Sequence, residues 1–503
     1  MLPGVVRAGE TFVAPVKAPP QESNLSQFEI PEYLKELADK VKTFKLKNGA
    51  TFIVMESDVS PTISFVTHAA VGAVDEEDGK TGIAHFLEHL AFKGTRAIGT
   101  KDYGQEKGLL AELSALESQA RELRKLRTED NIELSEVIRA IERTETEAEK
   151  LVIPNGFAKI VQKEGGVGLN AATTMDFTQY YYNFPSNKLE LWMVLESERF
   201  IQPVFRQFNK ERAVVLEERK LRVDNESVGK FLEQFLLEAF DKHPYRRPVI
   251  GFEEDILALT REDVESFFRK HYVPSTMTYS IVGNVKLNEV KAMAQKYFGD
   301  IQGEAPATAF IEPEPRQTAQ KSLTLKLSSE PYYFEGYHIP ALDDPMTPSL
   351  QVLSGVLSGS RTSRLYDNLI VKQRDALSAS FSRGFPGDLY PSLGILYAAP
   401  FPGKSLDNLA KALSKQMELV KTPGNVTEVE VDRVKLGSKY GILKTFTSNE
   451  ALAKVFAEYS ATTGDPKNVF RALAALDAVI PGDVTRTADA VFRDDNRTVG
   501  KIL

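Results

Sequence analysis

Residues 82–95 read GIAHFLEHLAFKGT and place His85, Glu88 and His89 at the spacing H-x-x-E-H. On a helix that turns about 100° per residue, His89 lies about 40° around the axis from His85, and Glu88 lies about 60° the other way. The three side chains therefore leave one face of one helix. Two imidazoles at this spacing can share a zinc ion, and a carboxylate beside them can take a proton from water that the metal activates. The segment predicts a zinc site with Glu88 as the general base.

A catalytic zinc ion needs a third protein ligand and an open position for water. The chain has no cysteine, and the other histidines show no metal-like pairing. In ERAVVLEE (211–218), positions 211, 214, 215 and 218 share one helical stripe, which puts two carboxylates beside two valines. A glutamate on an apolar stripe must be paired or bind a metal, because burying it bare costs several kcal/mol. The stripe alone does not decide whether Glu211 or Glu218 binds the metal. We choose Glu218 as the ligand and Glu211 as a supporting carboxylate, and we expect Glu217 to face solvent or to form a salt bridge.

The bulk composition is that of a soluble globular protein. The 503 residues are 42% hydrophobic and 26% charged, which fits two folded domains and not a disordered chain. No apolar run is long enough for a transmembrane helix. The net charge of −8 is modest and provides no basic surface for nucleic acid. The first residues lack the build of a secretory signal, although a targeting segment could already have been removed, so the compartment stays open between bacterial periplasm or cytoplasm and an organelle.

Strand and helix patterns alternate around the motif. Strands are expected at 41–46, 50–56 and 63–74, with the turn Lys47-Asn48-Gly49 between the first two, and the HFLEH helix should start near Gly82. Residues 170–184 and 278–284 have the composition of strands. Helices are expected at 188–200, 210–224 and 227–240.

Residues 108–152 have a different pattern. Leucine, isoleucine, valine and alanine recur at three- and four-residue steps in two runs that are separated by Thr128-Glu129-Asp130-Asn131. Charged residues fill the other positions. This pattern predicts an antiparallel helical hairpin with coiled-coil-like packing. It serves either as a solvated structural projection or as an arm that docks a partner.

The second half repeats the theme of the first. Strands at 322–327 and 332–338 lead into an apolar helix at 350–358 that has no histidine or glutamate pair. We therefore predict a duplicated α+β fold with one chemically silent copy. The expected divisions are an arm and short helix at 1–40, a zinc-bearing domain at 41–302 with the hairpin insertion at about 104–154, a proline-rich linker at 303–320, and a metal-free domain at 321–503.

With these motifs in view, the chain resembles the pitrilysin family of inverted-motif zinc peptidases, and in particular its two-domain branch, which includes the mitochondrial processing peptidase and bacterial processing-protease-like proteins. The stretches that carry the resemblance are GIAHFLEHLAFKGT, GGVGLNAATTMDFTQYYY, KERAVVLEER, HPYRRPVIGFEEDILALTREDVESFFRKHYVPSTMTYSIVGNV and, in the second half, GSRTSRLYDNL.

The resemblance implies roles for particular residues. It places the metal ligands on His85, His89 and Glu218, the general base on Glu88 and a supporting carboxylate on Glu211. It also implies that an extended substrate pairs with the edge of a strand at Asn170-Ala171. The implied fold is two α/β-sandwich domains facing each other across a cavity for unfolded peptides. The cofactor that the resemblance implies is one Zn²⁺ ion.

The chain departs from the family pattern at two places. The interval between His89 and Glu218 is longer than usual by about the length of the hairpin, and such an insertion need not disturb the site. The family's second domain usually supplies an Arg and a Tyr that hold the substrate carbonyl. In LIVKQRDALSAS (369–380) these positions hold Ile370 and Leu377, with Arg374 nearby. We therefore predict a paralogous partner subunit that supplies the Arg/Tyr pair, with a homodimer as the alternative.

The expected function is zinc-dependent endopeptidase cleavage of peptides or unfolded segments by the metal-bearing subunit of a hetero-oligomer. Two other functions remain open. One is a non-catalytic assembly or scaffold subunit, which would not need a general base. The other is a zinc hydrolase acting on something other than peptides, which the Asn-Ala edge strand disfavours.

Overall fold

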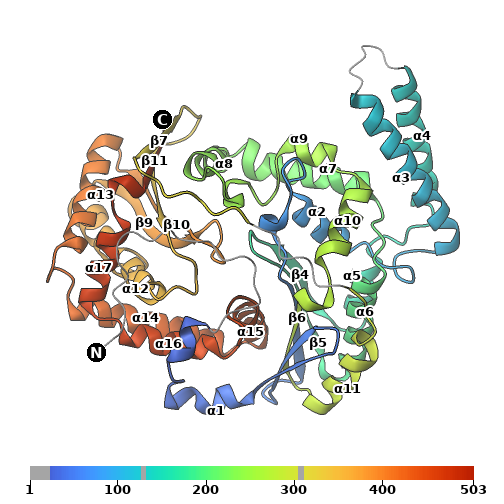
Figure 1. The fold of residues 1–503 in the computed structure, drawn as a ribbon, viewed down its shortest axis with the longest axis horizontal. Helices are drawn as coiled ribbons and strands as arrows, with labels where there is room; N and C mark the ends of the chain where they lie inside the picture. The colour runs from blue at the N-terminus through green and yellow to red at the C-terminus, as the bar shows by residue number, and fades with distance from the viewer. Residues whose placement is uncertain (1–22, 126–131, 304–310) are drawn as a thin grey trace.

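A computed structural model describes residues 23–125, 132–303 and 311–503 of the chain. It consists of two α/β units side by side, with a long helical hairpin standing away from the first (Figure 1). The expected turn residues of the hairpin, Thr128-Glu129-Asp130-Asn131, lie outside the described residues. So do residues 1–22 of the expected arm and 304–310 of the expected linker. Among the described residues, no helix has the length and apolar character needed to cross a membrane.

The first sheet has six strands in the order β1-β2-β6-β3-β5-β4. Only β2 and β6 are parallel neighbours, and the other pairs are antiparallel. The buried strands are rich in β-branched and aromatic residues, which suit a pleated surface covered on both faces. The strands are β1 (Val41–Lys45), β2 (Thr51–Glu56), β3 (Thr62–Ala69), β4 (Val167–Thr173), β5 (Thr178–Pro185) and β6 (Met277–Gly283). The expected strand at 63–74 is thus too long, because the chain leaves the sheet after Ala69 and turns into a short 3₁₀ helix, η2 (Ala73–Asp75).

The second sheet repeats the first but has no counterpart of β1. Its order is β7-β11-β8-β10-β9, and again one pair, β7 and β11, is parallel while the rest are antiparallel. The strands β7, β11, β8, β10 and β9 therefore correspond to β2, β6, β3, β5 and β4. The predicted duplication of an α+β fold is confirmed. The bounds are β7 (Lys321–Leu325), β8 (Tyr332–Ile339), β9 (Ala376–Phe385), β10 (Ser392–Pro400) and β11 (Arg497–Ile502).

Helices cover both sheets. In the first half they are η1 (Asn24–Gln27), α1 (Glu32–Lys40), α2 (Ile83–Leu90), α3 (Tyr103–Lys125), α4 (Ile132–Glu149), α5 (Gly156–Lys163), η3 (Ser186–Lys188), α6 (Leu189–Ile201), α7 (Phe208–Arg219), the π-helical turn η4 (Lys220–Asp224), α8 (Ser227–Ala239), η5 (Pro244–Arg246), α9 (Glu253–Ala258), α10 (Arg261–His271), η6 (Pro274–Thr276) and α11 (Leu287–Phe298). In the second half they are α12 (Thr347–Leu357), the π-helical η7 (Leu365–Lys372), α13 (Leu406–Lys421), α14 (Glu428–Thr445), α15 (Asn449–Thr463), α16 (Asn468–Ala478), α17 (Pro481–Val491) and η8 (Asp494–Asn496).

The two halves exchange helices. Helix α8 of the first half packs on β7 and β11 of the second sheet, and α15 of the second half packs on β3 and β6 of the first. Phe231 of α8 lies over Gly500, where an added Cβ would come within 2.3 Å of its ring. On the other side, Phe456 of α15 belongs to one buried cluster with Val66 and Val282 of the first sheet. Each sheet is thus covered by a helix from the other half, so the halves are joined by buried apolar surface.

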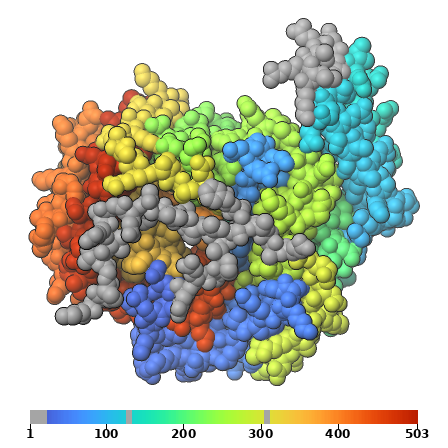
Figure 2. Space-filling view, viewed as in Figure 1, coloured from blue at the N-terminus to red at the C-terminus, as the bar shows by residue number. Residues whose placement is uncertain are grey.

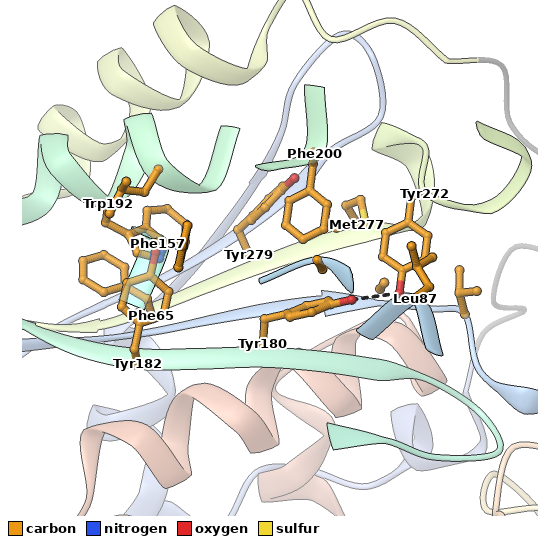
Figure 3. Packing of buried hydrophobic residues seen from close by; sticks show 14 of the residues in the cluster. Phe65, Leu87, Phe157, Tyr180, Tyr182, Trp192, Phe200, Tyr272, Met277 and Tyr279 are labelled. Carbon is orange, nitrogen blue, oxygen red and sulfur yellow. Dashed lines mark hydrogen bonds between the residues drawn. The ribbon is translucent and has the colours of Figure 1, made fainter. Parts of the chain in front are cut away.

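An aromatic core fills the space between the first sheet and its helices (Figure 3). Trp192 stacks on Phe65 with ring centroids 4.5 Å apart, and neither side chain reaches solvent. At the end of this core nearest α2, the hydroxyl groups of Tyr180 and Tyr272 lie 3.2 Å apart. This packing fixes α2 and the strands β3 and β5 relative to each other.

The hairpin of α3 and α4 stands out from the body of the molecule (Figure 2). The two helices pack along each other, with Leu113, Ala120 and Val137 among their buried residues, which confirms the predicted hairpin. Its root contacts α7, because the Asn209 side chain donates hydrogen bonds to a glutamate of each hairpin helix. The domain limits expected at 41–302 and 321–503 stay a prediction.

Candidate metal centre

Helix α2 carries His85, Glu88 and His89 and is held firmly at its N-terminus. The buried carboxylate of Glu76 accepts hydrogen bonds from the backbone amides of Gly82 and Ala84, each at 3.0 Å. These are amides of the first turn that have no partner within the helix. Burial raises the pKa of Glu76 to about 8, against the opposing effect of the two amides. Neither Glu76 nor its role is visible in the spacing of the motif.

Gly82 makes this tight start possible. Its φ is +84°, a backbone conformation that favours glycine, and an added Cβ would lie 2.5 Å from the carbonyl oxygen of Ile250. The helix then buries Phe86, Leu87 and Leu90 in the aromatic core. The opposite face, with the two histidines and Glu88, is turned toward α7 and β4.

Helix α7 brings the remote carboxylates to the histidines. Glu218 Oε2 lies 3.7 Å from His85 Nε2 and 3.4 Å from His89 Nε2. One ligand atom from each of these three residues falls within 4.8 Å of the others. Across the ranges 23–125, 132–303 and 311–503, no other group of three or more such side chains converges in this way. The structure therefore brings together the three predicted ligands.

The stripe on α7 is only partly as predicted. Val215 and Glu211 are buried, but Val214 is 46% exposed, because the buried face of α7 runs through Phe208, Glu211, Val215 and Arg219. Glu217 lies outside this face and pairs with Lys220 at 2.7 Å, as expected. Glu218 also meets Arg222, with 2.9 Å between its Oε1 and the guanidinium.

The two histidines have different electrostatic surroundings. Burial, and next the neighbouring His89, lower the pKa of His85 to about 3, so this ring is neutral at physiological pH. A neutral imidazole is the form that binds a metal. Burial also disfavours the charged form of His89, but its hydrogen bond to Glu211 and the charges of Glu218 and Glu88 outweigh burial and raise its pKa.

Glu211 supports His89 from behind. Its Oε2 lies 3.6 Å from His89 Nδ1, and its other oxygen forms an ion pair with Lys93. Burial acts to raise the pKa of Glu211, but His89 and Lys93 more than offset this and lower it. A carboxylate on the second nitrogen of a metal-binding histidine fixes the ring orientation. The structure thus places Glu211 beside His89, and its supporting role for a bound metal stays a prediction.

Glu88 lies between α2 and the edge strand β4. The hydroxyl of Thr173, the last residue of β4, donates a 2.5 Å hydrogen bond to Glu88 Oε2. Burial raises the pKa of the Glu88 carboxyl, and this hydrogen bond acts in the opposite direction. Sequence reasoning did not single out Thr173, although it lies only two residues beyond the predicted Asn-Ala edge.

The predicted substrate residues lie on that same strand. β4 is the outermost strand of the first sheet, next to β5 only. Asn170 is exposed, Ala171 is half-buried, and the Asn170 carboxamide oxygen accepts a hydrogen bond from the Ala171 amide at 2.9 Å. An edge strand of this kind presents backbone groups that an extended peptide can pair with.

The positions expected for a carbonyl-holding pair in the second half carry no such groups. Ile370 is packed against the second core, and Leu377 is 57% exposed. Arg374 is exposed and has a positive φ of 51°.

The residues of the centre fit a zinc ion. Two imidazole nitrogens and one carboxylate oxygen form the ligand set that leaves a fourth position open in catalytic zinc sites. His85 is neutral, and the Glu211 contact orients His89, so the chemistry of the donors agrees with this metal.

Comparison with protein families agrees with this geometry. The model described as "Insulinase (Peptidase family M16)" matches residues 53–117 and 146–252, and "Peptidase M16 inactive domain" matches 258–437. The chain belongs to peptidase family M16. The resemblance to pitrilysin-type peptidases is thereby confirmed. The M16 models leave out residues 118–145, of which the described residues 118–125 belong to α3 and 132–145 to α4.

The curated relatives of this M16 chain are named as zinc proteases. The "Zinc protease PqqE" of Helicobacter pylori is 26% identical over 469 residues, covering 91% of this chain and 92% of the relative. The "Uncharacterized zinc protease YmxG" of Bacillus subtilis is 21% identical over 459 residues, covering 90% and 96%. A solved protease structure from Helicobacter pylori aligns over 92% of this chain and 99% of its own, with a TM-score of 0.76 and 24% identity, and so shares the two-unit fold.

Proposed function

We propose that this chain is a zinc-dependent endopeptidase that hydrolyses peptides or unfolded polypeptide segments. The observation that carries the proposal is the meeting of His85, His89 and Glu218 around one point, with Glu88 on the same turn of α2 as the histidines. A structural role would not require a carboxylate held beside a ligand set of this kind. The names of the M16 relatives support the same reaction class.

His85, His89 and Glu218 would hold the ion, which when bound would polarise the scissile carbonyl and lower the pKa of water. Glu88 accepts the proton of the attacking water and passes it to the leaving amine. Its raised pKa makes this carboxylate a stronger proton acceptor. Glu211 keeps the His89 ring in place.

The substrate is proposed to lie along β4. An extended segment adds to the free edge at Asn170 and Ala171, which aligns its backbone with the strand that also ends beside Glu88. Backbone pairing reads no particular side chain, so this mode suits unfolded segments of varied sequence.

We also propose that the active form contains a second, related chain. Neither Ile370 nor Leu377 can donate a hydrogen bond to a substrate carbonyl from its side chain. A partner with an Arg/Tyr pair at these positions would complete the electrostatic stabilisation, and a homodimer is the alternative arrangement.

The experiment uses the purified full-length chain. Zinc content is measured by mass spectrometry, and cleavage is followed with a quenched peptide library and an unfolded protein, with and without proteins that copurify from the native source. The expected result is one zinc per chain and turnover that falls at least about 10³-fold in Glu88→Gln with the zinc retained. Turnover that is unchanged in Glu88→Gln would overturn Glu88 as the general base, and no turnover in any form of the protein would overturn the peptidase proposal. Full turnover by the chain alone as a monomer would overturn only the partner.

A non-catalytic assembly subunit is the second candidate, because the hairpin projects from the body and its outer part lies outside the M16 match. Deleting the helical hairpin of α3 and α4 tests which of the two proposed functions the chain has. Loss of complex formation, with no peptide turnover in any form of the protein, would favour the assembly role.

A further inference from the structure

The hydrogen bond from Thr173 to Glu88 joins two elements that are far apart in the chain. Thr173 ends β4, Glu88 lies in the middle of α2, and 85 residues separate them. Side chains alternate along a strand, so Thr173 points to the same side of the sheet as Ala171 and Leu169, which pack against the first core. This is the side that α2 covers. The hydroxyl therefore reaches Glu88 because of strand register, not because of a nearby loop.

The position of Thr173 is fixed from several directions. It pairs with Thr178 of β5 across the ladder. The turn that follows is closed by the Thr174 side chain, which accepts hydrogen bonds from the amides of Asp176 and Phe177 at 3.1 Å each. Because its backbone is fixed in this way, the Thr173 hydroxyl keeps its position when the Glu88 side chain moves.

The same turn is tied to the second half of the chain. The buried Asp176 accepts a hydrogen bond from the Tyr245 hydroxyl at 2.5 Å and two more from the amides of Asp388 and Leu389, at 2.7 and 3.1 Å. Asp388 and Leu389 precede β10 in the second half. The turn beside Thr173 is therefore held by both halves.

The orientation of the Glu88 carboxylate needs a hydrogen bond to fix it. A glutamate has three rotatable side-chain bonds, and this one is half-buried beside a second carboxylate, Glu218, whose charge disfavours its ionised form. The nearby hydroxyl groups of Tyr180 and Tyr272 are fully buried and lie within hydrogen-bond distance of each other. Thr173 is the residue whose hydroxyl bonds the carboxylate directly.

We infer that Thr173 is a positioning residue for the general base. Its hydroxyl holds Glu88 Oε2, so the second oxygen, Oε1, faces the reacting water and takes its proton. The inference rests on the proposed function. It adds that the strand which aligns the substrate at Asn170 and Ala171 also orients the base, so the scissile bond and Glu88 are set by one element. Binding energy along β4 then acts on a base that is already placed.

The test compares Thr173→Val, which keeps the shape and removes the hydroxyl, with Thr173→Ser, which keeps the hydroxyl. We expect kcat to fall about 10- to 100-fold in Thr173→Val with KM within about twofold, and Thr173→Ser to recover most of kcat. Zinc content should not change in either variant. In a Glu88→Gln background, Thr173→Val should leave the affinity for an uncleaved peptide unchanged. A kcat for Thr173→Val within twofold of the parent protein would overturn the inference.

Thr178→Val is the matched control. Thr178 faces Thr173 in the ladder, and its hydroxyl donates a buried hydrogen bond to the Val71 carbonyl at 2.9 Å, so its loss removes a buried hydrogen bond of the sheet while the bond from Thr173 to Glu88 stays. We expect kcat to stay within about twofold of the parent in this variant. An equal fall of kcat in Thr178→Val and Thr173→Val would assign the effect to general loosening of the sheet and overturn a specific role for Thr173.

A second readout does not depend on turnover. Crystal structures of the zinc-loaded parent and of Thr173→Val report the conformation of Glu88 directly. One ordered conformer in the parent and a displaced or multiple one in Thr173→Val would support the inference, and an identical Glu88 in both would overturn it. If the parent cleaves nothing, the peptidase proposal fails, and these structures still decide whether Thr173 holds Glu88.

Discussion

The pair of helices α2 and α7 in the first half and the pair α12 and α14 in the second half occupy corresponding places in the chain order around their sheets, but the side chains where the helices meet differ. Between α2 and α7, Glu218 faces His85 and His89. Where α12 meets α14 at Gly355 the contact is apolar and tight, since a Cβ added at Gly355 would lie 2.4 Å from Val434. A shared framework thus accommodates either a ligand set or a packed seam. The fold alone therefore does not determine the proposed metal site, which depends on a few side chains.

The carboxylates of the second pair have a different partner. Glu430 of α14 receives two hydrogen bonds from the Arg364 guanidinium, at 2.7 and 2.9 Å. The first half uses carboxylates to surround histidines, and the second uses one to anchor an arginine.

Removing the ligand on α7 is expected to have the largest effect on this comparison. Glu218→Gln should lose bound zinc and lower peptide turnover by at least about 10³-fold, because the site then keeps two protein ligands and loses one negative charge. Glu430→Gln, a change of a carboxylate on α14 of the second half, should leave zinc content and turnover unchanged. Zinc analysis and kinetics on both variants check this. A Glu218→Gln protein with full zinc content would show that the two helix pairs do not differ as described.

Changing the supporting carboxylate should have a smaller effect. Glu211→Gln is expected to weaken zinc binding by about 10- to 100-fold while the protein can still be loaded at high zinc, since the His89 ring loses its charged partner. Competition with a chelator of known affinity measures the change. Unaltered zinc affinity would mean that Glu211 serves Lys93 and α7 packing only.

Much of the geometry of the first site could be predicted from the sequence, since its candidate ligands lie on two helices with strong local signals. The H-x-x-E-H spacing puts three groups on one turn of α2, and the apolar stripe of α7 marks Glu211 and Glu218 as acids that need partners. Glu76 and Thr173 could not be found in this way. Both reach α2 through contacts set by the chain path and the strand register, and an isolated glutamate or threonine carries no periodic signal. The exchange of α8 and α15 is similar, because an apolar helix face does not say which sheet it covers.

Weakening the hydrogen bonds of Asp176, which join the turn beside Thr173 to the second half, should have a third, smaller effect on kcat. Asp176→Asn places an amide NH₂ among groups that donate to the present carboxylate, so at least one hydrogen bond of the turn is lost. We expect a loss of about 1–3 kcal/mol in unfolding free energy and a fall of about three- to tenfold in kcat, because the turn beside Thr173 loosens. Denaturant unfolding and kinetics at saturating peptide check both. Loss of stability with unchanged kcat would confine Asp176 to holding the halves together.

The arginine anchor of the second half should affect stability alone. Burial acts to raise the pKa of Glu430, but Arg364 and Thr427 outweigh it and lower the pKa to about 2. A carboxyl whose pKa is lowered on folding stabilises the protein above its unfolded pKa of about 4.5, and this stabilisation is lost as the pH falls toward 2. Glu430→Gln should therefore cost about 1–3 kcal/mol at pH 7 and progressively less between about pH 4.5 and 2. Unfolding measured across this range checks the sign, and a constant difference down to pH 2 would contradict it.

The most direct test of the account is a crystal structure of the zinc-loaded protein with anomalous data at the zinc absorption edge. We expect one strong anomalous peak per chain, about 2.0–2.2 Å from a nitrogen of His85, a nitrogen of His89 and an oxygen of Glu218. A peak at another place, or none at full zinc saturation, would contradict the central claim that these three residues form the metal centre.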